Sequence, residues 1–158
     1  MKPATSTLES TVQNPSPAQP VRDTESGVLT PVVRAFFTSR DRRAIGRWAE
    51  ALSAKFLESQ GAEIIGRNVK VSYSELDIIC RLGDELVFVE VRCRRKSPSM
   101  SAVDTLGPQK WRHLARGAEY YVQEHGWSGA WRIDLITIDV DGGSWALRWL
   151  KYLEMEEC

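Results

Sequence analysis

Two apolar stretches on either side of a Gly-Asp turn constrain the fold of this chain more than any other feature. The sequence of residues 73–95 is YSELDIICRLGDELVFVEVRCRR, and its central Gly83-Asp84 has the glycine-first composition of a two-residue hairpin loop. The opposed pairs that this loop predicts are Leu76 with Val91, Ile78 with Val89, and Cys80 with Val87. That side of the hairpin is wholly apolar, so it is predicted to be core. A slip of one residue would place acids in it, which argues for this register.

The other side of the same hairpin carries charged residues. Asp77 is predicted to lie opposite Glu90, and Glu75 opposite Arg92. Opposed Cβ atoms are roughly 4.5–5.5 Å apart, and like charges at that spacing are destabilising. A Mg²⁺ or Mn²⁺ ion would explain the paired acids, because both ions prefer oxygen ligands, and Arg92 could then hold a phosphate. The alternative is a solvated strand face on which Glu75 and Arg92 form a plain ion pair.

The rest of the chain predicts helices and further strands around the hairpin. Apolar residues recur at three- and four-residue spacing within residues 41–61 and 107–126, as on one face of a helix. Asp41 is a predicted N-cap and Gly61 a predicted stop signal for the first of these helices. The remaining predicted strands are residues 62–72, 131–140 and 144–153, the last as a fifth strand or an edge. The order αβββαβ predicts an α/β domain with a mixed central sheet flanked by helices.

Composition predicts one folded domain between two polar ends. Residues 1–40 are rich in Pro, Ser, Thr and Gln, with few periodic apolar residues, and are predicted to be disordered or loosely attached. Within them, Val32–Phe37 could dock on the domain or on a partner. The folded domain is predicted over residues 41–152, and residues 153–158 form a polar tail.

Charge, cysteine and hydropathy patterns exclude several classes of protein. The net charge of zero excludes a strongly basic, non-specific DNA coat. The three cysteines form no C-x-x-C pair, so neither a zinc site nor a disulfide framework is indicated. The N-terminus lacks the apolar region of a signal peptide, and no run approaches the roughly 20 apolar residues of a membrane span. We therefore expect a soluble, cytoplasmic protein without a membrane partner.

Basic residues follow the hairpin and begin the second predicted helix. The run of Arg92, Arg94, Arg95 and Lys96 could hold a phosphate backbone, or it could be a solvated loop. Lys110 lies in the first turn of the helix, where the dipole disfavours a cation, so a phosphate contact is one explanation. Asp134 shares a strand face with Arg132, where a structural ion pair is favoured over support of the acids.

Five short motifs occur in the order typical of the YraN family of small bacterial proteins, and the chain resembles that family. The motifs are GRWAE at residues 46–50, SELD at 74–77, FVEVR at 88–92, LGPQK at 106–110 and RID at 132–134. The family resembles the PD-(D/E)XK nucleases and is related to archaeal Holliday-junction resolvases. The resemblance implies a restriction-endonuclease-like αβββαβ core.

The resemblance also assigns roles to residues. It implies that Asp77 and Glu90 bind the metal with the Val91 carbonyl, and that Glu50 completes the acidic cluster. Arg92 stands where most such nucleases carry Lys, and Arg stays protonated, so it is no general base.

The function implied is a Mg²⁺- or Mn²⁺-dependent endonuclease-like protein acting on DNA, with branched or damaged DNA as candidate substrates. The alternative is a non-catalytic nucleic-acid-binding or adapter module of the same fold. A symmetric homodimer is compatible with either.

Overall fold

The computed structural model describes residues 22–72, 74–99, 104 and 106–153. These residues form a six-stranded sheet with strand order β1-β6-β5-β4-β3-β2, in which β4 and β5 are parallel and all other neighbours antiparallel. The elements are β1 Thr24–Val28, α1 Pro31–Ser39, α2 Arg42–Ser59, β2 Glu63–Val71, β3 Ser74–Leu82, β4 Glu85–Arg95, α3 Pro108–Glu124, β5 Trp131–Asp141 and β6 Ser144–Leu150. The mixed α/β sheet that the sequence predicts is therefore present.

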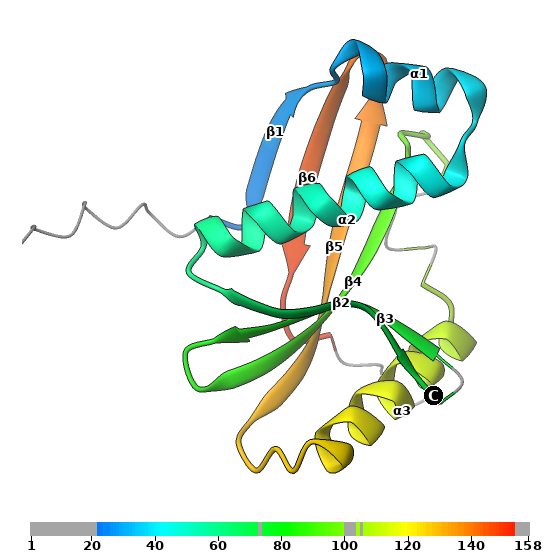
Figure 1. Cartoon of the computed structure of the whole chain (residues 1–158). Helices are drawn as coiled ribbons and strands as arrows, with labels where there is room; N and C mark the ends of the chain where they lie inside the picture. The colour runs from blue at the N-terminus through cyan, green and yellow to red at the C-terminus, as the bar shows by residue number, and fades with distance from the viewer. Residues whose placement is uncertain (1–21, 73, 100–103, 105, 154–158) are drawn as a thin grey trace, which may run out of the picture.

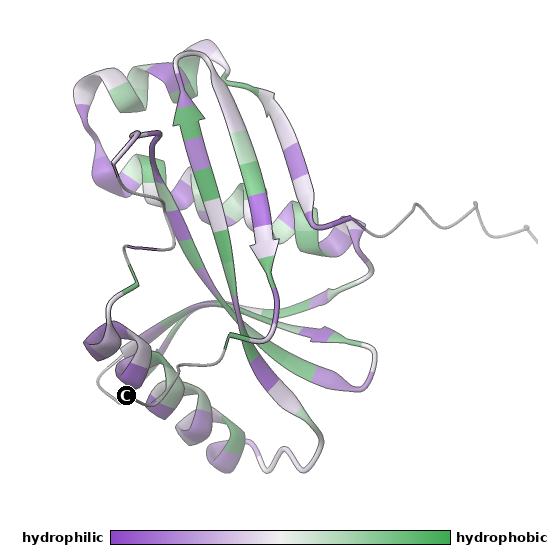
Figure 2. Cartoon of the chain, turned by 180° about the vertical axis from the view of Figure 1, so that it is seen from behind, coloured by the Kyte–Doolittle hydropathy of each residue, from purple (hydrophilic) through white to green (hydrophobic). Residues whose placement is uncertain are grey.

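Helices cover both faces of the sheet but not to the same extent. In Figure 1, α1 and α2 lie across one face, while α3 lies against the splayed lower ends of the central strands. A larger apolar cluster packs beneath α1 and α2 and includes Phe56, Val89 and Ile138. A smaller one packs beneath α3 and includes Phe88 and Leu114. Figure 2 shows that the rear of β1 and β6 has no helix over it.

The hairpin forms with the predicted register over most of its length. Ile78 pairs with Val89 and Cys80 with Val87, and Gly83 in the turn has φ +61°, which suits a glycine-first loop. The ladder between β3 and β4 ends at Ile78, so the predicted Leu76–Val91 pair is not part of it. Leu76 packs in the cluster beneath α3, whereas Ile78 and Cys80 pack beneath α2. The prediction of one wholly apolar face was therefore wrong at Leu76, because the two strands separate there.

Both predicted helices are confirmed with their signals. The Asp41 side chain accepts a hydrogen bond from the Ala44 N–H at 3.1 Å, as an N-cap should. Pro108 begins α3, whose inner face buries Leu114, Ala118 and Tyr121. The predicted basic loop begins later than expected, because β4 continues to Arg95 beside β5.

The segment before Asp41 differs from the expectation of a loosely attached extension. Strand β1 pairs with β6 along its length, and α1 follows with Thr30 as N-cap. Val33 and Phe37, one turn apart, are buried in the larger core. The Phe37 ring packs edge-on against Trp48, with the two ring centroids 5.9 Å apart. Both residues belong to the stretch Val32–Phe37, for which docking on the domain was one of the two predicted possibilities, whereas the polar composition gave no signal for strand β1. The predictions for residues 1–21 and 154–158 lie outside the described residues.

Candidate metal site at the opening of the hairpin

The predicted acid pair lies where β3 and β4 separate. Beyond Ile78 the backbone ladder stops, and the Asp77 carboxylate accepts the Val91 N–H at 2.9 Å. Asp77 thus provides the acceptor that a continued strand ladder would otherwise supply, and it lies close enough to Glu90 for each acid to affect the pKa of the other. The sequence therefore predicted the proximity of the two acids correctly, although they do not form a regular ladder pair.

Glu90 is almost completely buried, with an exposed fraction of 2%. Its Oε1 atom lies 3.4 Å from the Arg92 guanidinium and 3.4 Å from the Lys110 ammonium. Its Oε2 atom is buried without any hydrogen-bond partner. A buried polar atom without a partner costs roughly 1–3 kcal/mol, more if charged, so such an atom requires an explanation.

Burial and the neighbouring Asp77 charge raise the pKa of Glu90 to about 7, against the lowering effect of Lys110 and Arg92. Burial also raises the pKa of Asp77, while the hydrogen bond from the Val91 N–H and the charges of Lys110 and Arg92 lower it. Near pH 7 the Glu90 carboxyl is therefore protonated about half of the time.

The other predicted acids are not drawn into this pair. Burial raises the pKa of Glu50 on α2, the neighbouring Asn68 side chain lowers it, and the Asp77 charge raises it. Among the described residues, no group of three or more His, Cys, Asp or Glu side chains is arranged to hold a metal. The expectation that Glu50 completes an acidic cluster is thus not met in this geometry.

Glu75 also lies apart from the pair. It is exposed, and its partner across the sheet is Lys70 on β2. Within the described part of the chain, Arg92 forms its ion pair with Glu90 rather than with Glu75. The predicted cross-strand pair of Glu75 and Arg92 is absent because β3 and β4 no longer run as a ladder at that level.

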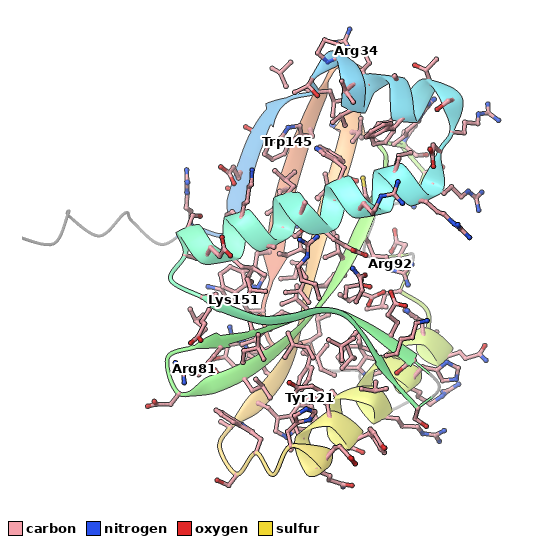
Figure 3. All side chains as sticks on the ribbon, viewed as in Figure 1. Arg34, Arg81, Arg92, Tyr121, Trp145 and Lys151 are labelled. Atoms are coloured by element: carbon pink, nitrogen blue, oxygen red, sulfur yellow. The ribbon has the colours of Figure 1, made fainter. Side chains whose placement is uncertain are left out.

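The predicted basic residues lie beside the acids, at the end of β4. Arg92, Arg94 and Arg95 line a cleft of about 720 Å³ between α1, α2 and β4. Figure 3 shows Arg92 just below the N-terminal half of α2. The Arg95 guanidinium donates to the Phe37 carbonyl at 2.5 Å, which ties β4 to the end of α1. Lys96, which follows, is exposed.

The sequence missed three contributions to this region. Arg40 and Arg42, at the junction of α1 and α2, line the same cleft, and no local pattern marks them because the fold alone brings them to β4. The contact of Lys110 with Glu90 was also missed, since Lys110 was predicted to hold phosphate. The order of the motifs predicts that Lys110 and Glu90 both belong to the site, but it does not predict the contact between them.

Asp134 belongs to a separate, structural network. It is fully buried, and it accepts hydrogen bonds from Arg132 at 3.0 and 3.2 Å, from the Trp149 indole at 2.9 Å and from the Tyr152 N–H at 2.9 Å. Asp134 pairs with Val89, whose side chain packs beneath α2, so it lies on the opposite face of the sheet from Glu90. The geometry agrees with the structural ion pair.

The donors at the hairpin opening fit a hard divalent cation. Mg²⁺ is commonly held by one or two carboxylates with waters and substrate phosphates completing the shell, so a third protein carboxylate is not required. Asp77 and Glu90 supply the carboxylates, and the partnerless Oε2 of Glu90 is the atom that a cation would satisfy. A cation would also compete with the proton that Glu90 retains near pH 7.

The arrangement of a mixed sheet, helices on both faces and an acid pair at the opening of a central hairpin defines an α/β protein with a restriction-endonuclease-like core. Residues 49–138 match the model of the family described as "Uncharacterised protein family UPF0102". The chain belongs to this family, which is the YraN family that its motifs resemble. In the described residues, no helix is long and apolar enough to cross a membrane.

Relatives in this family come from several bacteria. The chain is 34% identical to a UPF0102 protein of Shewanella woodyi over 103 residues, covering 65% of this chain and 88% of the relative. It is 33% identical to one of Herpetosiphon aurantiacus over 121 residues, covering 73% and 98%. A solved structure, Pyrococcus furiosus SfsA in complex with Ca²⁺, matches with a TM-score of 0.30 and 17% identity over 75% of this chain and 65% of that one. That likeness is too slight to support an argument.

Proposed function

We propose that this protein is a divalent-cation-dependent phosphodiesterase acting on DNA, with branched and damaged DNA as the first candidate substrates. The observation that carries the proposal is the acid pair in which the buried Glu90 has an Oε2 atom without a partner. Asp77, Glu90 and the Val91 carbonyl would hold Mg²⁺ or Mn²⁺. When bound, the cation would polarise the scissile phosphate and lower the pKa of an attacking water.

The chain's own cations would orient the phosphodiester. Arg92 and Lys110 both lie 3.4 Å from Glu90 Oε1. Since a bound cation would satisfy Glu90, the two side chains could then turn toward phosphate oxygens. Arg92 presents a planar guanidinium that suits two oxygens at once, whereas Lys110 acts as a point charge. Arg92 remains protonated, so its role is to hold the phosphate and stabilise its developing charge. It does not accept the proton of the attacking water.

One observation favours a second candidate, a DNA-binding module without turnover. Arg92 and Lys110 already balance the charge of Glu90 from within the protein, so the acid pair does not depend on a metal for neutralisation. In that case the basic cleft at the end of β4 would remain as the functional surface.

Cleavage assays separate these candidates. The full chain is incubated with Mn²⁺ and labelled four-way junction, flap, duplex and single-stranded DNA, beside Glu90→Gln. The matched control is Glu119→Gln, which changes an exposed acid on α3. Cleavage by wild type and control but not by Glu90→Gln is the expected result. Salt-sensitive binding without cleavage by any of the three supports the binding module, and equal cleavage by Glu90→Gln would remove the acid pair from the mechanism.

A further inference from the structure

The cleft beside the acid pair carries more positive charge than the hairpin motif alone provides. Its volume of about 720 Å³ lies within the range of pockets that enclose small organic ligands, about 300–1,000 Å³. Two separate segments contribute to its walls. The arginines among the lining residues are Arg40, Arg42, Arg92, Arg94 and Arg95.

The arginines of the α1–α2 junction are available to a ligand. In the part of the chain that the structure describes, neither Arg40 nor Arg42 takes part in a side-chain hydrogen bond or ion pair. Both residues are exposed and line the cleft. Two guanidinium groups that line one cavity without an ion-pair partner favour an anionic ligand with more than one charge.

The floor of the cleft is apolar. Phe37, Ile45 and Ala49 line it between the two basic walls, and Phe37 and Ala49 are buried in the larger core. Phosphates alone would give no reason for such a floor, because they bind at charged surfaces. A nucleobase presents an apolar face of the kind that packs on such a floor. In a duplex the bases are stacked and paired inside the helix, so only an unpaired strand offers phosphates and a base to the same cavity.

The cleft adjoins the acid pair, although neither Asp77 nor Glu90 lines it. Val91 and Arg92 line the cleft and also contact the acids: the Val91 N–H donates to Asp77, and Arg92 is paired with Glu90. A strand lying in the cleft would therefore pass the residues that contact the acid pair.

We propose that this cleft binds an unpaired DNA strand, with Arg40 and Arg42 holding phosphates on the wall opposite β4 and a base resting on the floor at Ile45. The identification of the polymer as DNA rests on the proposed function. Both arginines lie before residue 49, where the family match begins. The N-terminal segment thus adds a binding wall to the family's core.

The test measures binding alone, with the full chain, a fluorescent oligo(dT) and EDTA, so that cleavage and metal have no part. The variant Arg40→Asn/Arg42→Ala removes both charges. Asn is chosen because Arg40 has φ +56°, a left-handed conformation that Asn tolerates. The matched control Arg43→Ala/Arg47→Ala removes the same charge from exposed positions of α2 outside the cleft.

We expect the cleft variant to bind oligo(dT) about tenfold more weakly than wild type, while the control changes little. Because the variant no longer neutralises two phosphates of the single strand, its salt-dependence slope should also be lower by about 1.4. Equal weakening in both variants would overturn the proposal, since it would indicate a general effect of charge.

Three further outcomes would also overturn the proposal: duplex bound as tightly as oligo(dT), oligo(rU) bound more tightly than oligo(dT), or effective competition by polyglutamate. Binding without cleavage in the Mn²⁺ assay would leave the cleft assignment standing and count against the phosphodiesterase. Cleavage of duplex by a protein that fails to bind oligo(dT) would support the phosphodiesterase and overturn the cleft assignment.

Discussion

Two buried acids on neighbouring strands, Asp134 on β5 and Glu90 on β4, have opposite electrostatic surroundings. Asp134 has a donor for each oxygen: Arg132 reaches both, and the Trp149 indole and the Tyr152 N–H add one bond each. Glu90 has both its cations at one oxygen, a second acid beside it, and no partner for the other oxygen. Both oxygens of Asp134 therefore have partners within the protein, although Arg132 Nη2 has none, whereas one oxygen of Glu90 has no partner.

The difference indicates which carboxylate maintains the fold and which awaits a ligand. A buried carboxylate whose two oxygens both have donors holds the neighbouring elements together, and its loss leaves those donors unpaired. A buried carboxylate oxygen without a donor costs folding free energy, and acid pairs with raised pKa values concentrate at functional sites. By this reasoning Asp134 fastens residues 151–153 to the sheet, while Glu90 and Asp77 form the site. Substitution of the two acids should therefore have opposite effects on stability.

The largest expected effect on stability is the loss of the hydrogen bonds that Asp134 accepts. Asp134→Ala removes the acceptor of three groups and leaves the buried Arg132 with Glu85 and Tyr152 as its remaining partners. Breaking a buried pair by removing one member costs about 3–5 kcal/mol, and we expect a loss of that order in the free energy of unfolding. Urea denaturation measures it, with Asp141→Asn at an exposed position of the same strand as the control. A loss no larger than the control's would show that Asp134 does not fasten the chain.

The next effect has the opposite sign. The pKa of Glu90 is about 7 in the folded protein, above its ordinary value of 4.5. The folded state therefore binds the proton more tightly, so this contribution to stability is complete below about pH 4.5 and is lost as the pH rises through 7.

Glu90→Gln imitates the protonated acid and should avoid that loss. We expect it to be more stable than wild type by about 3 kcal/mol at pH 8 and equally stable near pH 4.5. Urea denaturation at a series of pH values measures the difference. A variant less stable than wild type at pH 8 would mean that the contacts of Arg92 and Lys110 outweigh the cost of burial.

A third comparison adds the cation. A ligand that binds only the folded state stabilises it by mass action, by about 1.4 kcal/mol at ten times its dissociation constant. Mn²⁺ should therefore raise the Tm of wild type and of Asp134→Ala, and leave the Tm of Glu90→Gln and Asp77→Asn unchanged. The shift should be larger at pH 8 than at pH 6, because the cation competes with the Glu90 proton. An equal shift in Glu90→Gln would place the cation elsewhere.

The smallest effect concerns Lys110, which is partly exposed and lowers the pKa of Glu90. Lys110→Ala should change the free energy of unfolding by less than about 1 kcal/mol, as exposed ion pairs do. It should also move the pH at which Mn²⁺ affinity develops to a higher value, because the Glu90 proton is then held more tightly. Arg112→Ala, an exposed cation on the same helix, is the control. No movement of that pH would separate Lys110 from the acid pair.

The sequence predicted the hairpin, both main helices and the proximity of Asp77 to Glu90, because these depend on local patterns. Alternation fixed the register from Ile78 to Leu82, and capping signals marked α2 and α3. Features that depend on tertiary contacts could not be predicted from these local patterns. The opening of the strands at Asp77 arises from a side chain that takes a backbone N–H, and alternation contains no signal for that.

The docking of residues 22–40 also depends on partners far along the chain. Strand β1 is short and polar, and it is stable only because β6 offers a free edge. Its neighbour α1 then brings Arg40 to the cleft, about fifty residues in sequence from the Arg92 beside it.

The most direct test of the acid pair is calorimetric titration of Mn²⁺ into the full chain near pH 6.5, in two buffers of different ionisation enthalpy. One ion should bind with release of most of one proton, because at this pH most Glu90 carboxyl groups are protonated and the cation displaces that proton. Glu90→Gln should bind no ion, and Asp141→Asn should behave as wild type. Binding without proton release, or binding retained by Glu90→Gln, would contradict a metal site at the acid pair.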